Sequence, residues 1–391
     1  MLLRKIIHGA VFREEGSFAP DTVYICDEKI ISEEAYHRIT AHNPSAETTV
    51  TDAAECYVIP GLTDIHIHGC MGSDCCDGTI EALQTIARYE LRQGITTITP
   101  TTMTLPEEHL AKICRAAKTF HKSKEDNAAD FCGLYLEGPF LNSDKKGAQN
   151  GKYIIPADTA MLKRLQDASG GLIRTVAIAP ETEGAMDFIR ENSSQFHISI
   201  AHTTADYNTA KEAISCGASQ LTHTFNAMPP FSHRAPGPIG AAADDTQCNA
   251  ELICDGIHVH PAAVRTAFKI FGDHRIILIS DSMRATGLAD GQYDLGGQNV
   301  IVNGNLAVLE DGTIAGSVTN LMDCVRTAVK SMGIPLASAI KCAAVNPAKA
   351  VSIYQDYGSI APDKYANIVI LDKNLDIKMV MHRGIIPSFG I

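Results

Sequence analysis

Four histidines and two acidic residues stand at or near the ends of short apolar segments of the chain. They are His66, His68, Glu137, His202, His223 and Asp281. Imidazole nitrogens and carboxylate oxygens are ligands that suit zinc and ferrous iron alike. If the six side chains meet, the sequence predicts a site for one or two divalent ions, zinc or iron. Taken singly, each acidic residue could instead cap a turn or a helix, and each histidine could be an ordinary structural residue.

His66 and His68 give the most local indication of such a site. Side chains two residues apart on a β-strand point the same way, so both imidazoles are aimed into one space. Two rings so placed suit a divalent ion, whereas without one they repel each other when protonated. A carboxylate such as Glu137 can bridge two ions, and Asp281 is best interpreted as a base beside water bound to a metal.

The segments that carry these residues alternate with stretches of helical periodicity. Strands that alternate with helices form parallel βαβ units, and eight such units close into a (β/α)8 TIM barrel. Functional residues of this fold lie at the carboxyl ends of the strands, where all six residues stand. The predicted strands are Leu62–His68, Ile95–Thr101, Cys132–Glu137, Ile173–Ala179, His197–His202, Gln220–Thr224, Ala250–Cys254 and Ile276–Asp281.

The remaining segments predict a second, smaller unit. Residues 1–57 and residues 355–391 contain short strand-like runs, yet neither piece can form a stable sheet alone. We expect them to pair into one small β-sandwich domain, with residues 58–354 as the barrel. An alternating, glycine-rich stretch at about 288–315 predicts an inserted hairpin. Helical patterns at Asn320–Met332 and Ala337–Ala344 complete the outside of the barrel.

The composition restricts the class of protein. Hydrophobic residues make up 45% and charged residues 20% of the 391 residues, which is typical of a globular chain. The net charge of −12 argues against nucleic acid as a partner, because no basic surplus is present for a phosphate backbone. No apolar run approaches the roughly 18 residues of a membrane span, and the start has no cleavage-site pattern. The twelve cysteines follow no disulfide or zinc-ribbon spacing, so we expect free thiols in a cytoplasmic protein with no membrane partner.

Several motifs resemble a known superfamily of hydrolases. The segment PGLTDIHIHG at 60–69 resembles the signature of the amidohydrolase superfamily. Further segments resemble one branch of it, the N-acetylglucosamine-6-phosphate deacetylases, and the resemblance spans nearly the whole chain. These segments are LEGPFLN at 136–142, THTFNAMP at 222–229, RAPG at 234–237, DGIHVH at 255–260 and AGS at 315–317.

The resemblance implies two ion positions. The ion that family members share would be held by Glu137, His202 and His223. A second ion would be held by His66 and His68 together with Glu137 and Asp281.

The resemblance also implies contacts to an amino-sugar phosphate. Asn226 and Ala227 would contact the phosphate, and His258 would lie near the acetamide or hydroxyl groups. Arg234 would reach the phosphate bound in the neighbouring subunit of a homodimer. Many family members carry a histidine, which helps hold the sugar or its carbonyl, where this chain has Gln149. Since glutamine forms hydrogen bonds but cannot become a cation, the identity of the sugar stays open.

The implied reaction is metal-dependent hydrolysis of the acetamide of N-acetyl-D-glucosamine 6-phosphate to glucosamine 6-phosphate and acetate. A divalent ion lowers the pKa of bound water toward about 7 and polarises the carbonyl. We expect the resulting hydroxide to attack the acetyl carbon, with Asp281 as general base and then as acid. The alternatives are an N-acetylgalactosamine-6-phosphate deacetylase, an amidohydrolase for cyclic amides and a non-catalytic sugar-phosphate sensor. Enzymes for cyclic amides commonly carry a lysine after the fourth strand, and Ile173–Pro180 contains none.

Overall fold

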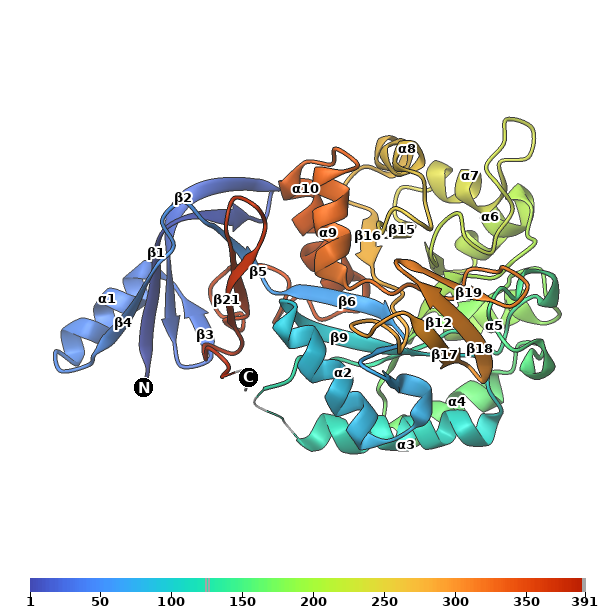
Figure 1. Cartoon of the computed structure of the whole chain (residues 1–391), viewed down its shortest axis with the longest axis horizontal. Helices are drawn as coiled ribbons and strands as arrows, with labels where there is room; N and C mark the ends of the chain where they lie inside the picture. The colour runs from blue at the N-terminus through green and yellow to red at the C-terminus, as the bar shows by residue number, and fades with distance from the viewer. Residues whose placement is uncertain (124, 126, 389–391) are drawn as a thin grey trace.

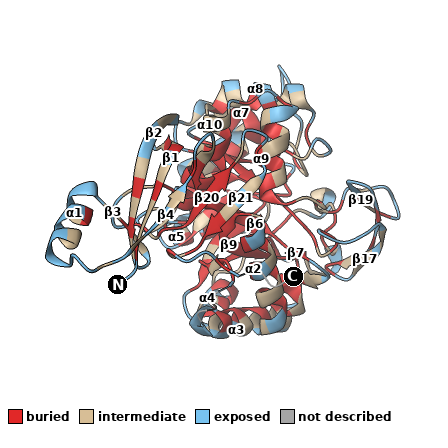
Figure 2. Cartoon of the chain, turned by 60° about the vertical axis from the view of Figure 1, so that its left-hand side comes forward, coloured by how far each residue is buried: buried red, intermediate tan, exposed pale blue. Residues whose placement is uncertain are grey.

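The computed structural model describes residues 1–123, 125 and 127–388. It consists of a parallel barrel wrapped by helices and, beside it, a smaller sheet built from both ends of the chain (Figure 1). The barrel strands are buried, whereas the helix of the small unit and an inserted sheet near the barrel mouth are largely exposed (Figure 2). The predicted fold class is therefore confirmed.

Eight parallel strands form the barrel, and all eight predicted segments are confirmed with shifts of a few residues at their ends. Neighbouring strands pair in chain order from the first to the eighth. The first and last strands meet through backbone hydrogen bonds beyond the last paired residues. Asp281 N donates to His66 O and His68 N donates to Ser282 O, each over 2.9 Å. The strands are β6 (Leu62–Ile67), β9 (Ile95–Thr102), β11 (Leu134–Leu136), β12 (Ile173–Ile178), β13 (His197–Ile200), β14 (Ala218–Leu221), β15 (Asn249–Ile253) and β16 (Ile276–Ile279).

Helices cover the outside of the barrel and connect successive strands. Among the described residues, no helix is both long enough and apolar enough to cross a membrane. Lys341–Val345 forms a π-helical turn between the last two helices. The helices are α2 (Ile80–Arg92), α3 (Glu107–Ser123), α4 (Thr159–Ser169), α5 (Ala185–Asn192), α6 (Tyr207–Ser215), α7 (Gly237–Asp244), α8 (Pro261–Phe271), α9 (Leu321–Lys330), α10 (Leu336–Ile340) and α11 (Asn346–Ala350).

Helix α7 lies where the sequence indicated only a proline-rich loop. Its sequence, GPIGAAAD, has a proline in the first turn and buried small residues, so it lacks the wide apolar stripe that marks most helices. Tyr207 Oη donates to Asp244 Oδ2 over 2.6 Å at the far end of the helix. The prediction was therefore wrong here because close packing of alanines, and not amphipathic periodicity, forms this helix.

The two chain ends form one seven-stranded sheet. Strands β5 and β20 pair antiparallel, with Tyr57 opposite Leu371, so residues more than three hundred positions apart are joined. Apolar side chains of β1–β3 pack in one core with those of β5, β20 and β21, which gives the sheet its own interior. The strands are β1 (Leu3–Arg13), β2 (Ser17–Cys26), β3 (Lys29–Ile31), β4 (Thr48–Asp52), β5 (Tyr57–Pro60), β20 (Ile368–Leu371) and β21 (Ile377–Met381). The division of the chain at 57/58 and 354/355 stays a prediction.

Four further features depart from the sequence analysis or add to it. Helix α1 (Glu33–His42) was not predicted, since Tyr36 is its only buried residue and the apolar periodicity is weak. The predicted insertion has three antiparallel strands where a hairpin was expected. These strands are β17 (Gly291–Leu295), β18 (Gln298–Asn303) and β19 (Leu306–Leu309). Two short pairs of residues, β7 (Gly69–Cys70) and β8 (Ser73–Asp74), form a hairpin after β6, and β10 (Asp130–Phe131) pairs with β9 before β11 begins.

Candidate metal centre

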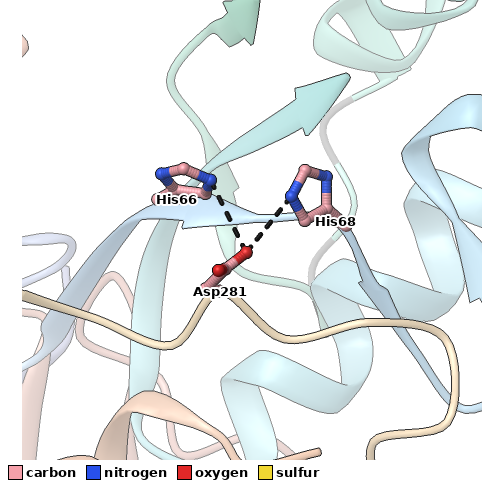
Figure 3. A group of neighbouring side chains, drawn as sticks. All are labelled: His66, His68 and Asp281. Carbon is pink, nitrogen blue, oxygen red and sulfur yellow. Dashed lines mark ion pairs between the residues drawn. The ribbon is translucent and has the colours of Figure 1, made fainter. Parts of the chain in front are cut away.

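A first group of three buried side chains lies where strand β16 meets strand β6. Asp281 Oδ1 is 3.6 Å from His66 Nε2 and 3.2 Å from His68 Nε2. Figure 3 shows both rings on one side of the strand, directed at this carboxylate oxygen. The prediction that these residues meet, although more than two hundred positions separate them, agrees with this geometry.

A second group of three, formed by Glu137, His202 and His223, lies beside the first. Glu137 Oε1 is 3.1 Å from His202 Nε2 and 2.9 Å from His223 Nε2. The same carboxylate also faces the first group, with Oε1 3.7 Å from His66 Nε2 and Oε2 3.3 Å from His68 Nε2. Glu137 therefore lies between the two groups, in the position of a bridging ligand.

The spacing of these atoms fits coordination of divalent ions. Four ligand atoms placed tetrahedrally at about 2.0–2.1 Å from one zinc ion lie about 3.3 Å apart. The nitrogen–oxygen separations of 2.9–3.7 Å bracket this value. In addition, His202 Nε2 and His223 Nε2 are only 3.2 Å apart, and two lone pairs at that distance repel each other unless a cation or a proton lies between them.

Acceptors on the far side of the rings fix their orientation. His66 Nδ1 is 3.0 Å from Glu251 Oε2, and His202 Nδ1 is 2.8 Å from the backbone oxygen of Lys145. Because both partners can only accept, the hydrogen is assigned to Nδ1, which leaves the Nε2 lone pair facing the centre. His66 Nε2 is buried without a hydrogen-bond partner among the described residues. This is the ring orientation that metal-binding histidines adopt.

The electrostatics agree with a site for cations. Burial opposes charge on His68, yet hydrogen bonds to Asp281 and Glu137 raise its pKa to about 10. Burial also opposes charge on Glu137, yet His66, His202 and His223 hold its pKa well below the usual range. The two carboxylates thus favour positive charge in this buried space, and bound divalent ions would provide that charge in place of protonated histidines.

A pocket of about 370 Å³ opens onto the two groups. Four of the five predicted substrate contacts line it, namely Gln149, Asn226, Ala227 and His258. His258 Nδ1 is 2.7 Å from Asp255 Oδ2, which orients the ring. Arg234 does not line the pocket; it lies exposed in the loop before α7 and has no hydrogen bond or ion pair within the described part of the chain.

Gln149 is held on both sides by the protein. Its Oε1 accepts from the backbone N of Thr104 over 2.7 Å, and its Nε2 donates to Glu137 Oε2 over 2.7 Å. A histidine at this position could not make both contacts with the same geometry, because its two ring nitrogens lie on a rigid ring. Gln149 therefore touches the carboxylate that both groups share, and a substrate would have to compete for its amide.

The backbone at three of the six residues has a left-handed conformation. The φ angles are 43° at His202, 27° at His223 and 49° at Asp281. Such values are uncommon for residues other than glycine and cluster at functional sites. Gly69, directly after His68, is required for a different reason, since a Cβ there would collide with the backbone oxygen of Ser73.

Sequence reasoning missed several residues around the site. Glu251 is fully buried on β15 and orients His66, but it stands inside its strand and not at the end where the six predicted ligands lie. A carboxylate inside the apolar run Ala250–Ile253 was the available signal, because burying one without partners is costly. Leu295, Thr313 and Ile314 bring the inserted segment to the pocket, which no local pattern indicated.

All twelve cysteines are free thiols, as expected. Cys75 and Cys76, near the rim of the barrel, are both buried, and burial raises the pKa of each thiol well above its usual range. Since the thiolate is the reactive form, this burial disfavours reaction at either thiol.

Known proteins resemble this chain over most of its length. Residues 57–386 match the model of the amidohydrolase family. An N-acetylglucosamine-6-phosphate deacetylase from Bacillus subtilis (strain 168) is 37% identical over 334 residues, which are 85% of this chain and 84% of the relative. An N-acetylgalactosamine-6-phosphate deacetylase from Escherichia coli O157:H7 is 34% identical, covering 87% of this chain and 90% of the relative.

A solved structure agrees with these relatives. It is a mutant N-acetyl-D-glucosamine-6-phosphate deacetylase from Mycobacterium smegmatis in complex with N-acetyl-D-glucosamine-6-phosphate. It superposes with a TM-score of 0.88 at 30% identity and covers 98% of both chains. The barrel, the two groups of candidate metal ligands and these similarities together show that the chain is a hydrolase and belongs to the amidohydrolase family.

Proposed function

We propose that the protein removes the acetyl group from N-acetyl-D-glucosamine 6-phosphate in a metal-dependent hydrolysis that yields glucosamine 6-phosphate and acetate. The observation that carries this proposal is that three of the four imidazoles and both carboxylates line one pocket of about 370 Å³, with His66 buried directly behind them. A pocket of that volume suits a small molecule. The relative from Bacillus subtilis and the solved structure from Mycobacterium smegmatis both bear the name of this activity.

The two groups would hold one or two divalent ions, with Glu137 between them. When bound, such an ion polarises the acetyl carbonyl and lowers the pKa of water. Zinc and ferrous iron both fit nitrogen and carboxylate donors. The chain's own contribution is orientation, because Glu251 and the backbone oxygen of Lys145 hold the rings of His66 and His202 before any substrate arrives.

Asp281 would carry the proton through the reaction. Its side chain lines the pocket and is 10% exposed, so it can reach both a water molecule and the substrate. The new bond joins the water oxygen to the acetyl carbon, and the bond that breaks is the carbon–nitrogen bond of the amide. The amine must leave neutral, so the proton taken from water has to reach its nitrogen. A carboxylate beside both positions can perform the two transfers.

The phosphate would lie against the segment that follows β14. Positive φ angles at His223, Phe225 and Ala227 alternate with ordinary values at the residues between them. The backbone N–H groups of His223, Thr224 and Asn226 donate within the protein, so the phosphate would meet Asn226 and Ala227, which line the pocket at this turn. Arg234, exposed and unpaired within the described residues, would complete the phosphate site of the neighbouring subunit in a homodimer. The free thiols fit the cytoplasm, where thiols stay reduced.

N-acetylgalactosamine 6-phosphate is a second candidate substrate. The relative named for that sugar is 34% identical to this chain, close to the 37% of the relative named for the glucosamine epimer. The two sugars differ at one hydroxyl group, and Gln149, whose amide is already held by Thr104 and Glu137, does not by itself select between them. A cyclic-amide substrate is less supported because Ile173–Pro180 lacks a lysine, and a non-catalytic sensor would not need all six ligands.

The decisive experiment is the measurement of acetate release from both sugar phosphates. Protein stripped of metal with a chelator should be inactive, and added Zn²⁺ or Fe²⁺ should restore turnover. A preference for N-acetyl-D-glucosamine 6-phosphate in kcat/KM is expected, whereas a preference for the galactosamine epimer would support the second candidate. Activity that survives complete removal of metal, or the lack of acetate from either sugar, would refute the proposal.

A further inference from the structure

Glu251 lies inside strand β15, fully buried and outside the lining of the pocket. Three donors point at its carboxylate. Oε2 accepts from His66 Nδ1 over 3.0 Å and from the backbone N of His223 over 3.1 Å, and Oε1 accepts from Gln220 Nε2 over 2.6 Å. These partners offset the cost of burying the carboxylate and give each of its oxygens a fixed direction.

These contacts reach both groups of candidate ligands. His66 belongs to the first group and His223 to the second. The backbone oxygen of Glu251 also accepts from Thr224 N over 2.8 Å, so this one residue holds the amides on both sides of the His223 carbonyl. Since His223 has a φ of 27°, its backbone needs outside support to keep the ring in place.

The contact with His66 decides which ring nitrogen faces the centre. The carboxylate accepts a hydrogen bond from Nδ1–H, and Nε2 then presents its lone pair to the space between Asp281 and Glu137. That nitrogen is buried and has no hydrogen-bond partner in the described part of the chain, as a ligand awaiting an ion would. Partners of this kind typically contribute 10- to 100-fold to metal affinity, because they orient the ring and make it more basic.

We propose that Glu251 is a positioning residue that assembles the metal centre by orienting the ring of His66 and by fixing the backbone of His223. It acts through these two ligands, since its carboxylate is shielded from the pocket. The inference rests on the proposed function, because it requires that the six residues bind divalent ions.

Binding of Zn²⁺ to the metal-stripped full-length chain tests this role. We expect Glu251→Gln to weaken binding about 10- to 100-fold, because it removes the charge but keeps an oxygen for His66 and His223. Glu251→Leu, which removes every acceptor, should weaken it further. If Glu251→Leu does not fold, Glu251→Gln still decides the question. The expected order is wild type, then glutamine, then leucine, measured by competition with a chromophoric chelator.

A matched control variant and a double variant distinguish the positioning of metal ligands from a general effect on the stability of the fold. Asp130 is a carboxylate only 12% exposed beside the buried His382, whose Nε2 is 3.1 Å away, and it does not line the pocket at the candidate metal centre. Asp130→Asn should therefore leave Zn²⁺ affinity unchanged. In a His66→Asn background, Glu251→Gln should lose most of its effect, because the ring through which Glu251 acts is gone.

The outcomes distinguish this inference from the proposed function. Wild-type protein that binds no Zn²⁺ would refute the proposed function itself. Wild-type protein that binds Zn²⁺, together with unchanged affinity in Glu251→Gln, would overturn the role of Glu251 alone. The same conclusion would follow from an equal loss in Asp130→Asn, or from a Glu251→Gln effect that persists in full without His66.

Discussion

Asp281→Asn isolates the proton transfers that we assign to Asp281. Asparagine keeps the size of the side chain and one carbonyl oxygen beside His66 and His68, but it cannot take up and return a proton. It also tolerates the left-handed backbone, with a φ of 49° at this position, better than most residues do. The backbone bonds of Asp281, from its N to His66 O and from Ser317 N to its O, involve no side-chain atom and should persist. Alanine would be a poorer choice, because it would add strain.

The expected loss follows from the role. General acid–base catalysis contributes about 10²–10⁴-fold, so kcat should fall by that factor, which corresponds to about 2.7–5.5 kcal/mol in the activation free energy. Acetate release gives kcat, and elemental analysis of the same sample gives the metal content, which should stay near that of the wild type. Activity above about a tenth of wild type would refute the proton-carrying role. A parallel loss of metal would show instead that Asp281 matters chiefly as a ligand.

Two further substitutions test the phosphate site and a buried acid. Arg234→Ala should raise KM for the phosphorylated sugar by about 10- to 100-fold, as expected for one lost charged hydrogen bond, and should leave KM for the unphosphorylated sugar nearly unchanged; an equal rise for both sugars would exclude a phosphate contact. Glu90 is fully buried, neither carboxylate oxygen has a hydrogen-bond partner among the described residues, and burial followed by the charge of Asp64 raises its pKa well above the usual range. Above pH 4.5, the ordinary pKa of this acid, Glu90 is ionised in the unfolded chain but stays protonated in the folded chain. The free energy of unfolding therefore falls by about 1.4 kcal/mol for each pH unit, until the pH reaches the pKa of Glu90 in the folded chain. Urea unfolding at several pH values should thus show that the free energy of unfolding of Glu90→Gln rises relative to that of wild type as the pH increases from 5. A difference in stability that does not change with pH would contradict the assignment.

The barrel could be predicted from the sequence because its strands are short, buried and separated by helices. Ile276–Ile279 is apolar throughout and lies between Arg275 and Ser280, and Ile173–Ile178 is apolar except for Arg174 and Thr175, so both runs have the length and composition of buried strands. The helices α1 and α7 were missed because their burial depends on partners remote in sequence. Tyr36 of α1 lies against Tyr24 of β2, and α7 packs against α6 and β14. No local pattern records such contacts.

The ligand set was accessible for a related reason, whereas the residues that orient it were not. His202 and Asp281 each stand two residues after their strands, and the fold brings the carboxyl ends of all strands to one rim. Glu251 stands in the middle of its strand, and the oxygen that holds His202 belongs to the backbone of Lys145. A backbone acceptor cannot be recognised from the residue type. The groups that orient the ligands therefore have to be identified from the structure.

Closure of the barrel and construction of the centre depend on the same few hydrogen bonds. Asp281 N donates to His66 O, and this bond joins the eighth strand to the first while it places the Asp281 carboxylate opposite the His66 ring. A left-handed residue costs on the order of 1–3 kcal/mol, and the bond from Ser317 N to Asp281 O, over 2.7 Å, helps to hold it. Substitutions that loosen the contact between β16 and β6 should therefore lower metal affinity before they unfold the chain, because the strained residue at that seam is itself a candidate ligand.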